Sequence, residues 1–302
     1  MSDDQNFRKN FYKKVGFRTF DEKHAIETLL KDKPLDIDKL RLYCLRCPVS
    51  AKYRVYLWKV VLGVIPASQD SHEFVMKNRQ EQYDLLKSSL EVMRRIHCDT
   101  PVVEVFLKMF LIEEGLLPFH DSGLCDQHSC YMSIAQLVSQ MAESNIEAYW
   151  ITNKFYRMFS RSMKDVLPTL PEKVKTLLKK EDTDCKLWNH LAKHELWQIL
   201  PLKRWFSTCF AAVLPEIPFE RVVDKVLGGS VMILVYVAVS LLITLKRPLL
   251  TMASREDMIQ YLTQVPEDTG DILVNNAIDL WEKQGHHMTK SDSPGPINRS
   301  PS

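Results

Sequence analysis

Apolar residues return at intervals of three and four positions along most of the chain, which is the spacing of amphipathic helices. Segments with this spacing predict helices over 21–30, 35–46, 50–63, 70–96, 129–141, 146–159, 173–180, 187–199 and 219–227, with another opening at Thr100-Pro101 and two more before residue 283. No pair of segments alternates as strands do, and 9 glycines in 302 residues leave little material for tight hairpins. The pattern therefore predicts an all-α fold.

The longest of these predicted helices covers 70–96. Asp70 offers an N-cap, and Glu73 three residues later can complete a capping box. One apolar stripe runs along the helix through Tyr83, Leu86, Leu90 and Met93. This stripe either faces the domain's own core or receives a helix from a partner protein, and the sequence leaves both interpretations open.

An uncharged apolar run extends over 226–245 and is followed by two basic residues. Its length permits a transmembrane helix. However, Gly228-Gly229 and Ser230 resemble a helix stop followed by a new cap, which shortens the continuous apolar helix. We therefore expect a helix in the core of a large helical domain. A membrane-anchored helical protein is the alternative.

Composition narrows the possible classes of function. Hydrophobic residues make up 45% of the chain, charged residues 26%, and the net charge is +2, so nothing favours nucleic acid as a partner. The seven cysteines show no regular spacing, and the first ten residues lack the apolar core of a signal peptide. Both features favour free thiols and a cytoplasmic protein. The last segment, 285–302, has no periodicity, is rich in Gly, Pro and Ser, and predicts a disordered tail.

Candidate cofactor and metal sites are sparse. Neither of the glycine-rich patterns of phosphate and dinucleotide binding occurs. One Cys-x-x-Cys pair lies at Cys44 and Cys47, and a predicted loop holds Cys125, His128 and Cys130. Neither set supplies the four ligands of structural zinc, so we expect no metal and no cofactor.

Four short motifs occur in a characteristic order. They are Arg54-Val55-Tyr56-Leu57-Trp58, Glu147-Ala148-Tyr149-Trp150, Trp205-Phe206, and Arg221-Val222-Val223-Asp224. In order and spacing they resemble the TBC family, the all-helical GTPase-activating domains that act on Rab-type small GTPases. The residues that carry this fold signature are Arg54, Trp58, Trp150, Trp205, Phe206 and Asp224. The aromatic members are expected to be core anchors rather than ligand contacts.

The resemblance implies a single multi-helix domain built of two helical halves. On this basis we divide the chain into an N-terminal helical extension over 1–40, a TBC-like helical domain over 41–284, and the tail over 285–302.

The family's catalytic residues are an Arg in I-x-x-D-x-x-R and a Gln in Y-x-Q-G-M. Here Ile96-His97-Cys98-Asp99 matches the first half of the Arg motif, and Val102 stands at the Arg position. Tyr131-Met132-Ser133 places Ser133 at the Gln position, whereas counting back without gaps from Tyr149-Trp150 reaches Ser129. With either alignment the resemblance implies that the usual catalysis is lost. A guanidinium supplied in trans is worth roughly three to five orders of magnitude in rate. Arg94 and Arg95 lie upstream, and an active Rab GTPase-activating protein that uses one of them as a non-standard finger remains an alternative.

The chain is most similar to a divergent, non-catalytic branch of the family. The resemblance lies in Tyr149-Trp150-Ile151-Thr152, in Pro101 with Glu104-Val105, and in Ile278-Asp279-Leu280-Trp281. It implies an accessory subunit of the tuberous sclerosis complex that binds a coiled coil of hamartin and, through it, tuberin. That complex activates GTP hydrolysis on Rheb and restrains mTOR signalling at lysosomes, which implies a cytoplasmic protein recruited to lysosomal or vesicle membranes by its partners. The long 70–96 helix is the candidate partner surface.

Overall fold

The computed structural model describes residues 18–263 and 265–284, and all regular elements in these ranges are helices, so the all-α prediction is confirmed. The first half comprises α2 (Arg18–Leu29), α3 (Ile37–Arg46), α4 (Ala51–Val61), the 3-10 turn η1 (Gln69–Ser71), α5 (His72–Val92), α6 (Val102–Glu113), α7 (Leu124–Gln127), α8 (Ser129–Met141) and α9 (Asn145–Met163). The second half comprises η2 (Leu167–Thr169), α10 (Leu170–Glu181), α11 (Lys186–Lys193), η3 (Leu196–Gln198), α12 (Leu202–Ser207), α13 (Glu216–Leu227), α14 (Ile233–Thr244), α15 (Lys246–Thr251), α16 (Arg255–Tyr261) and α17 (Glu267–Lys283).

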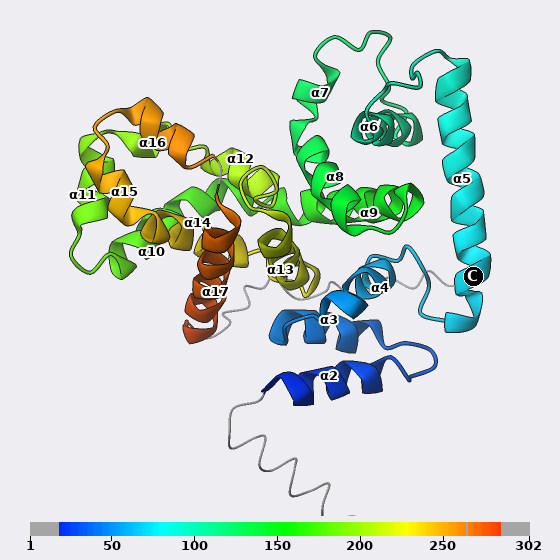
Figure 1. Cartoon of the computed structure of the whole chain (residues 1–302), viewed down its shortest axis with the longest axis horizontal. Helices are drawn as coiled ribbons and strands as arrows, with labels where there is room; N and C mark the ends of the chain where they lie inside the picture. Colours follow the sequence, from blue (N-terminus) through cyan, green and yellow to red (C-terminus); the bar gives the residue numbers. More distant parts are fainter. Residues whose placement is uncertain (1–17, 264, 285–302) are drawn as a thin grey trace, which may run out of the picture.

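The two halves lie side by side and meet through α13. In Figure 1 the elements of the first half occupy the right and lower part of the view, and those of the second half the left. Contacts between the halves run from α3 and α8 to α13. The long helix α5 stands at the outer edge of the first half, with α6 and α9 on its inner side (Figure 1).

The apolar run over 226–245 is divided between two helices. α13 ends at Leu227, and α14 begins at Ile233. α14 packs against α10, α12, α13 and α17, which explains why it is apolar on all sides. Within the described residues, no helix has both the length and the apolar character needed to cross a membrane.

The start and the end of the 70–96 helix were predicted wrongly. Asp70 lies inside the 3-10 turn η1, and α5 begins only at His72 with no side-chain cap. At the other end, Arg94 has a φ of 55°, a left-handed conformation that stops the helix before Ile96.

The sequence predicted one domain boundary near each end of the chain, at residue 40 and at residue 285. α3 runs through the predicted boundary at residue 40 and packs against both α4 and α13, so we propose to count it with the main helical domain. The predicted tail over 285–302 lies outside the described residues.

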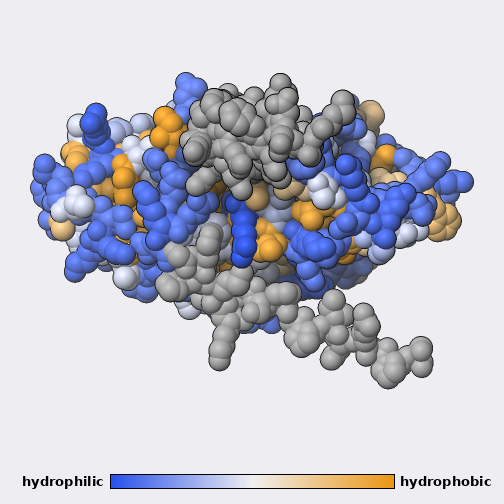
Figure 2. All heavy atoms as spheres, turned by 90° about the horizontal axis from the view of Figure 1, so that it is seen from below, coloured by the Kyte–Doolittle hydropathy of each residue, from blue (hydrophilic) through white to orange (hydrophobic). Residues whose placement is uncertain are grey.

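The surface of the described chain is mainly hydrophilic on the face shown in Figure 2, where hydrophobic residues appear in separate patches. Most of the large apolar side chains lie instead in one continuous core that includes Trp58, Trp150, Trp205 and Phe206. This placement agrees with their expected role as core anchors.

Candidate functional site

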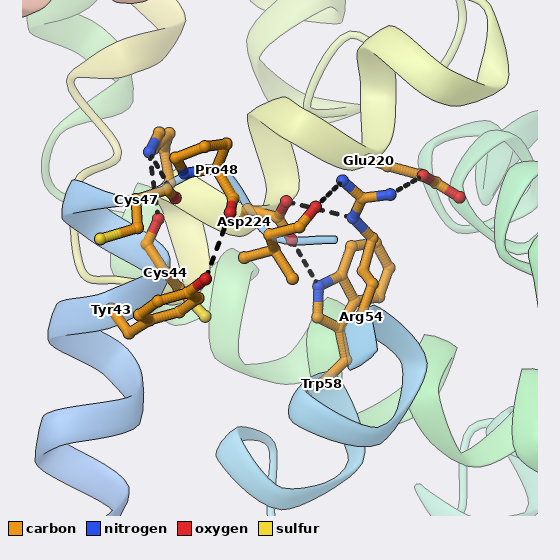
Figure 3. A network of polar contacts seen from close by, with 10 residues as sticks. Tyr43, Cys44, Cys47, Pro48, Arg54, Trp58, Glu220 and Asp224 are labelled. Atoms are coloured by element: carbon orange, nitrogen blue, oxygen red, sulfur yellow. Dashed lines mark hydrogen bonds and ion pairs between the residues drawn. The ribbon is translucent and has the colours of Figure 1, made fainter. Parts of the chain in front are cut away.

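The fold-signature residues of α4 and α13 form a buried polar network between the two halves (Figure 3). The Arg54 guanidinium donates from Nε to Asp224 Oδ2 at 3.1 Å, from Nη2 to the Val49 carbonyl at 2.7 Å, and from Nη1 to Glu220. The other Asp224 oxygen, Oδ1, accepts from Trp58 Nε1 at 2.8 Å. One carboxylate thus orients both an arginine and an indole.

Lys225 extends the network to the end of α3. Its buried ammonium donates to the carbonyls of Cys44, Leu45 and Cys47 at 3.2, 3.0 and 3.2 Å. A cation near the carboxyl end of a helix satisfies carbonyls that have no partner within the helix. This lysine therefore fastens α3 to α13.

Burial dominates the electrostatics of this cluster. It raises the pKa of the Asp224 and Glu220 carboxyls, although the Arg54 guanidinium opposes the shift. It also lowers the pKa of Lys225. A cleft of about 440 Å³ lies beside the network, but the buried donors described above already have acceptors within the protein. The cluster is suited to holding the halves together rather than to chemistry.

The two residues that the resemblance assigns to the family's catalytic positions, Val102 and Ser133, lie in the first half. Val102 is the first residue of α6 and is exposed. Ser133 lies in the first turns of α8, where its hydroxyl donates back to the Ser129 carbonyl at 2.9 Å. Tyr131, two residues earlier, is fully buried and donates to Asn153 Oδ1 at 2.5 Å. Neither a Val nor a Ser side chain offers a guanidinium or a planar amide.

A cluster of charged residues around Lys108, which we call the clamp, also lies in the first half of the chain. Lys108 on α6 is buried and contacts Glu104 at 2.7 Å, Asp121 at 2.9 Å, and the Arg95 carbonyl at 2.7 Å. Burial alone would lower the pKa of Lys108, but its bonds to the two carboxylates raise it. These contacts hold the loop after α6 against the segment that follows α5.

The two upstream arginines differ in their surroundings. Arg95 donates to the Pro118 carbonyl at 2.8 Å and pairs with Asp121, so it belongs to the clamp. Arg94 is exposed, and no carboxylate lies within ion-pair distance of it among the residues that the structure describes. Only Arg94 is therefore free to reach a partner without breaking existing contacts.

The cysteine and histidine residues named above do not form a metal centre. In the described ranges, no three His, Cys, Asp or Glu side chains are arranged to hold a metal ion. All seven cysteines are free thiols, with Cys44 and Cys209 buried.

The stripe of α5 singled out in the sequence faces mostly inward. Tyr83 and Leu90 are buried, and Tyr83 makes edge-to-face contacts with Phe106 and Tyr149 at 6.3 and 5.6 Å between ring centroids. Leu86 packs partly against the core, and Met93 is exposed. Of the two interpretations of this stripe, the structure therefore favours the domain's own core.

The opposite side of α5 carries apolar residues that sequence reasoning did not select. Phe74, Leu85 and Val92 are 70%, 68% and 83% exposed. Their separations of 11 and 7 residues place all three within about 20° of one line along the helix, given roughly 100° per residue. We call these residues the α5 stripe. The only signal in the sequence was this long spacing, which the stronger inward stripe obscured.

The comparisons with known proteins agree with this architecture. The RabGAP TBC domain family matches residues 127–268. TBC1 domain family member 7 of Homo sapiens is 40% identical over 280 residues, covering 92% of this chain and 95% of that protein. The protein of the same name from Danio rerio is 37% identical over 289 residues, covering 94% and 97%. The crystal structure of the Ypt/Rab-GAP domain of Gyp1p superposes with a TM-score of 0.57 at 14% identity, covering 88% of this chain and 98% of that one, and shows the shared fold. The chain therefore belongs to the TBC domain family, together with the proteins named TBC1 domain family member 7.

Proposed function

We propose that this protein is a non-catalytic TBC-domain subunit that binds a coiled coil of hamartin and thereby supports the tuberous sclerosis complex. In this role it contacts tuberin through hamartin, and the assembled complex activates GTP hydrolysis on Rheb and restrains mTOR signalling. The protein is then cytoplasmic and reaches lysosomal or vesicle membranes through its partners. The observation that carries the proposal is the α5 stripe.

The geometry of the α5 stripe suits a partner helix. Phe74 and Val92 are 18 residues apart, which is about 27 Å along a helix. Leu85 and Val92 are one heptad apart, the repeat with which coiled coils present apolar residues. α5 lies at the edge of the molecule, with its packed neighbours on the inner side (Figure 1). A rod-shaped partner can therefore lie along its whole outer face without disturbing the domain.

The finger positions support the non-catalytic part of the proposal. A GTPase-activating partner must place a cation on the transferred phosphoryl group and orient a water molecule. Val102 and Ser133 supply neither group, and the clamp formed by Lys108 and Asp121 engages Arg95.

Charge placed in the α5 stripe tests the proposal. We expect Leu85→Glu to weaken binding of a hamartin coiled-coil fragment by at least about 30-fold, since burying an unpaired carboxylate at an apolar contact costs roughly 2 kcal/mol or more. Ile272→Glu is the matched control because Ile272 is also exposed, at 56%, but lies on α17 in the other half. The measurement is fluorescence anisotropy of a labelled fragment titrated with each variant. Equal affinities for the two variants would exclude the α5 stripe as the docking surface.

A second candidate function is an active Rab GTPase-activating protein with Arg94 as the finger. It is favoured by the exposure of Arg94 and by the lack of a carboxylate partner within the described ranges. On this hypothesis Arg94→Glu abolishes stimulated GTP hydrolysis and leaves the circular dichroism spectrum unchanged. Unaltered stimulation in Arg94→Glu would eliminate it.

A further inference from the structure

A groove lined by lysines and a tryptophan lies in the second half of the chain. It has a volume of about 460 Å³, opens to solvent, and is lined by Glu172, Lys175, Thr176, Lys179, Lys180 and Trp188. α10 supplies the first five of these residues and α11 the tryptophan. The five are spaced by three, one, three and one positions, which places them on one face of the helix. The groove is therefore formed by one side of α10, with an indole as its wall.

Two lysines of the groove lie near the faces of aromatic rings. Lys179 Nζ lies 5.9 Å from the ring centroid of Trp188, and Lys175 Nζ lies 6.0 Å from that of Trp197. The two indoles pack against each other at 5.1 Å between centroids. Because an ammonium group is attracted to an aromatic face, these contacts favour one placement of side chains that are otherwise flexible.

The positive charge of the groove is neutralised at one end only. Lys175 pairs with Glu172 at 2.7 Å. Lys179 and Lys180 are exposed, and neither has a carboxylate within ion-pair distance among the residues that the structure describes. The groove therefore presents two unpaired ammonium groups near the end of α10, beside the indole of Trp188.

The charge of a phosphate monoester matches these two ammonium groups. Such a group carries about −1.5 to −2 charges near neutral pH and has three strong acceptor oxygens. A carboxylate or a phosphodiester carries only a single charge. Lysine binds phosphate as a compact point charge that needs no fixed direction of approach. The volume of the groove also lies within the roughly 300–1,000 Å³ of small-molecule sites, which favours a small ligand over a protein segment.

Trp188 adds an apolar surface beside the two charges. Its side chain is half-buried and lines the groove. An indole packs well against the carbon atoms of a ligand. Inorganic phosphate would leave this surface uncovered, so we expect the phosphate to be carried by an organic group.

We propose that the groove binds a phosphate monoester, carried either by a small soluble molecule or by a lipid headgroup. The phosphate lies between Lys179 and Lys180, and the organic part lies against Trp188. Glu172 repels the phosphate from the other end of the groove and keeps Lys175 engaged. The groove belongs to α10 and α11, whereas the α5 stripe belongs to the first half, so this proposal does not depend on the proposed function.

The test is acylation of lysine side chains in the full-length chain, resolved residue by residue by mass spectrometry. Glycerol 3-phosphate is the soluble probe. With this probe at about five times its dissociation constant, Lys179 and Lys180 should react about sixfold more slowly, because only the unoccupied molecules react. Lys77 on α5 is the matched control, since it is also exposed and lies in the other half, and its rate should not change.

Three variants separate a specific site from general attraction to lysines. Lys180→Glu should raise the dissociation constant measured at Lys179 by at least about tenfold, because a repulsion replaces a charge-assisted hydrogen bond. Lys180→Arg should leave this constant within about twofold, because the positive charge is retained. Glu172→Gln should lower it about threefold, because Lys175 loses its partner and becomes a third free cation.

Vesicles distinguish the two sources of the phosphate. Vesicles of phosphatidylcholine with phosphatidic acid present a phosphate monoester, and vesicles with the same fraction of phosphatidylglycerol present a phosphodiester. Protection of Lys179 by the phosphatidic acid vesicles but not by glycerol 3-phosphate would assign the groove to a lipid headgroup. Protection by glycerol 3-phosphate alone would assign it to a soluble molecule, and protection by both would show that the monoester itself is recognised.

Three results would overturn the proposal. One is an unchanged rate at Lys179 and Lys180 with both glycerol 3-phosphate and phosphatidic acid. Another is equal protection of Lys77, which would show that the probe screens lysines without occupying a site. The third is equal protection by phosphatidylglycerol and phosphatidic acid vesicles without protection by glycerol 3-phosphate, which would show attraction to membrane charge rather than recognition of a monoester.

Discussion

Removal of the Asp224 carboxylate should destabilise the domain more than any single surface change. Asp224 is 2% exposed and is the shared acceptor for Arg54 and Trp58, which belong to a helix about 170 residues earlier in the chain. In Asp224→Ala the guanidinium of Arg54 keeps Glu220 and the Val49 carbonyl but loses its second carboxylate, and the indole N–H of Trp58 loses its acceptor. Breaking a buried ion pair by removing one partner costs about 3–5 kcal/mol.

We expect Asp224→Ala to lower the free energy of unfolding by about 4 kcal/mol, a large fraction of the 5–15 kcal/mol typical of a domain. Asp224→Asn keeps an acceptor for Trp58 and should cost less, about 2 kcal/mol. The matched control is Asp271→Ala, because Asp271 also faces an arginine, Arg221, at 3.8 Å but is half exposed. A surface pair of this kind contributes about 0.5 kcal/mol or less.

The assay is urea unfolding followed by both tryptophan fluorescence and far-ultraviolet circular dichroism, with coincident transitions required before free energies are compared. In the double variant Arg54→Met with Asp224→Ala, the cost should be smaller than the sum of the two single costs, because each single variant already loses the same Arg54–Asp224 contact. A cost below about 1 kcal/mol for Asp224→Ala would refute the idea that this network joins the halves.

Three further perturbations have outcomes that follow from the packing. Gly228→Ala should cost about 1–3 kcal/mol in urea unfolding, because its new Cβ would lie 2.6 Å from the backbone nitrogen of Leu45 and force α3 and α13 apart. Burial raises the pKa of Cys44 to about 12, so at pH 8 only about one Cys44 thiol in ten thousand is ionised. A maleimide should therefore label the exposed Cys98 rapidly, while Cys44 reacts only when the protein unfolds. Lys108→Met should release the loop after α6 and speed its amide hydrogen exchange by at least about tenfold; unchanged exchange would mean that the clamp does not hold it.

Much of the fold could be predicted from the sequence, because core anchors are local and chemically distinct. Trp58, Trp150 and Trp205 identify the family and occupy the core as expected. The helix periodicity also located nearly every helix, since each packs one apolar face against its neighbours. The prediction of a capping box at Asp70 was wrong, because Asp70 lies inside a 3-10 turn whose own backbone hydrogen bond takes the place of a side-chain cap.

The candidate site was harder to predict because its contacts join distant parts of the chain. Nothing local in the sequence shows that Lys225 caps α3, about 180 residues away, or that Asp121 occupies Arg95. The α5 stripe was missed for another reason. Both faces of α5 carry apolar residues, and only the packing of α6 and α9 decides which face is covered.

We propose that the chain, which has the fold of a Rab GTPase-activating domain, lacks the catalysis of that family. This proposal is tested most directly by GTP hydrolysis on a panel of Rab GTPases and Rheb with the purified full-length chain added. On this proposal we expect the intrinsic rate for every GTPase in the panel, because the resemblance assigns Val102 and Ser133 to the positions of the two catalytic side chains. Stimulation of any of them by two orders of magnitude or more would contradict it.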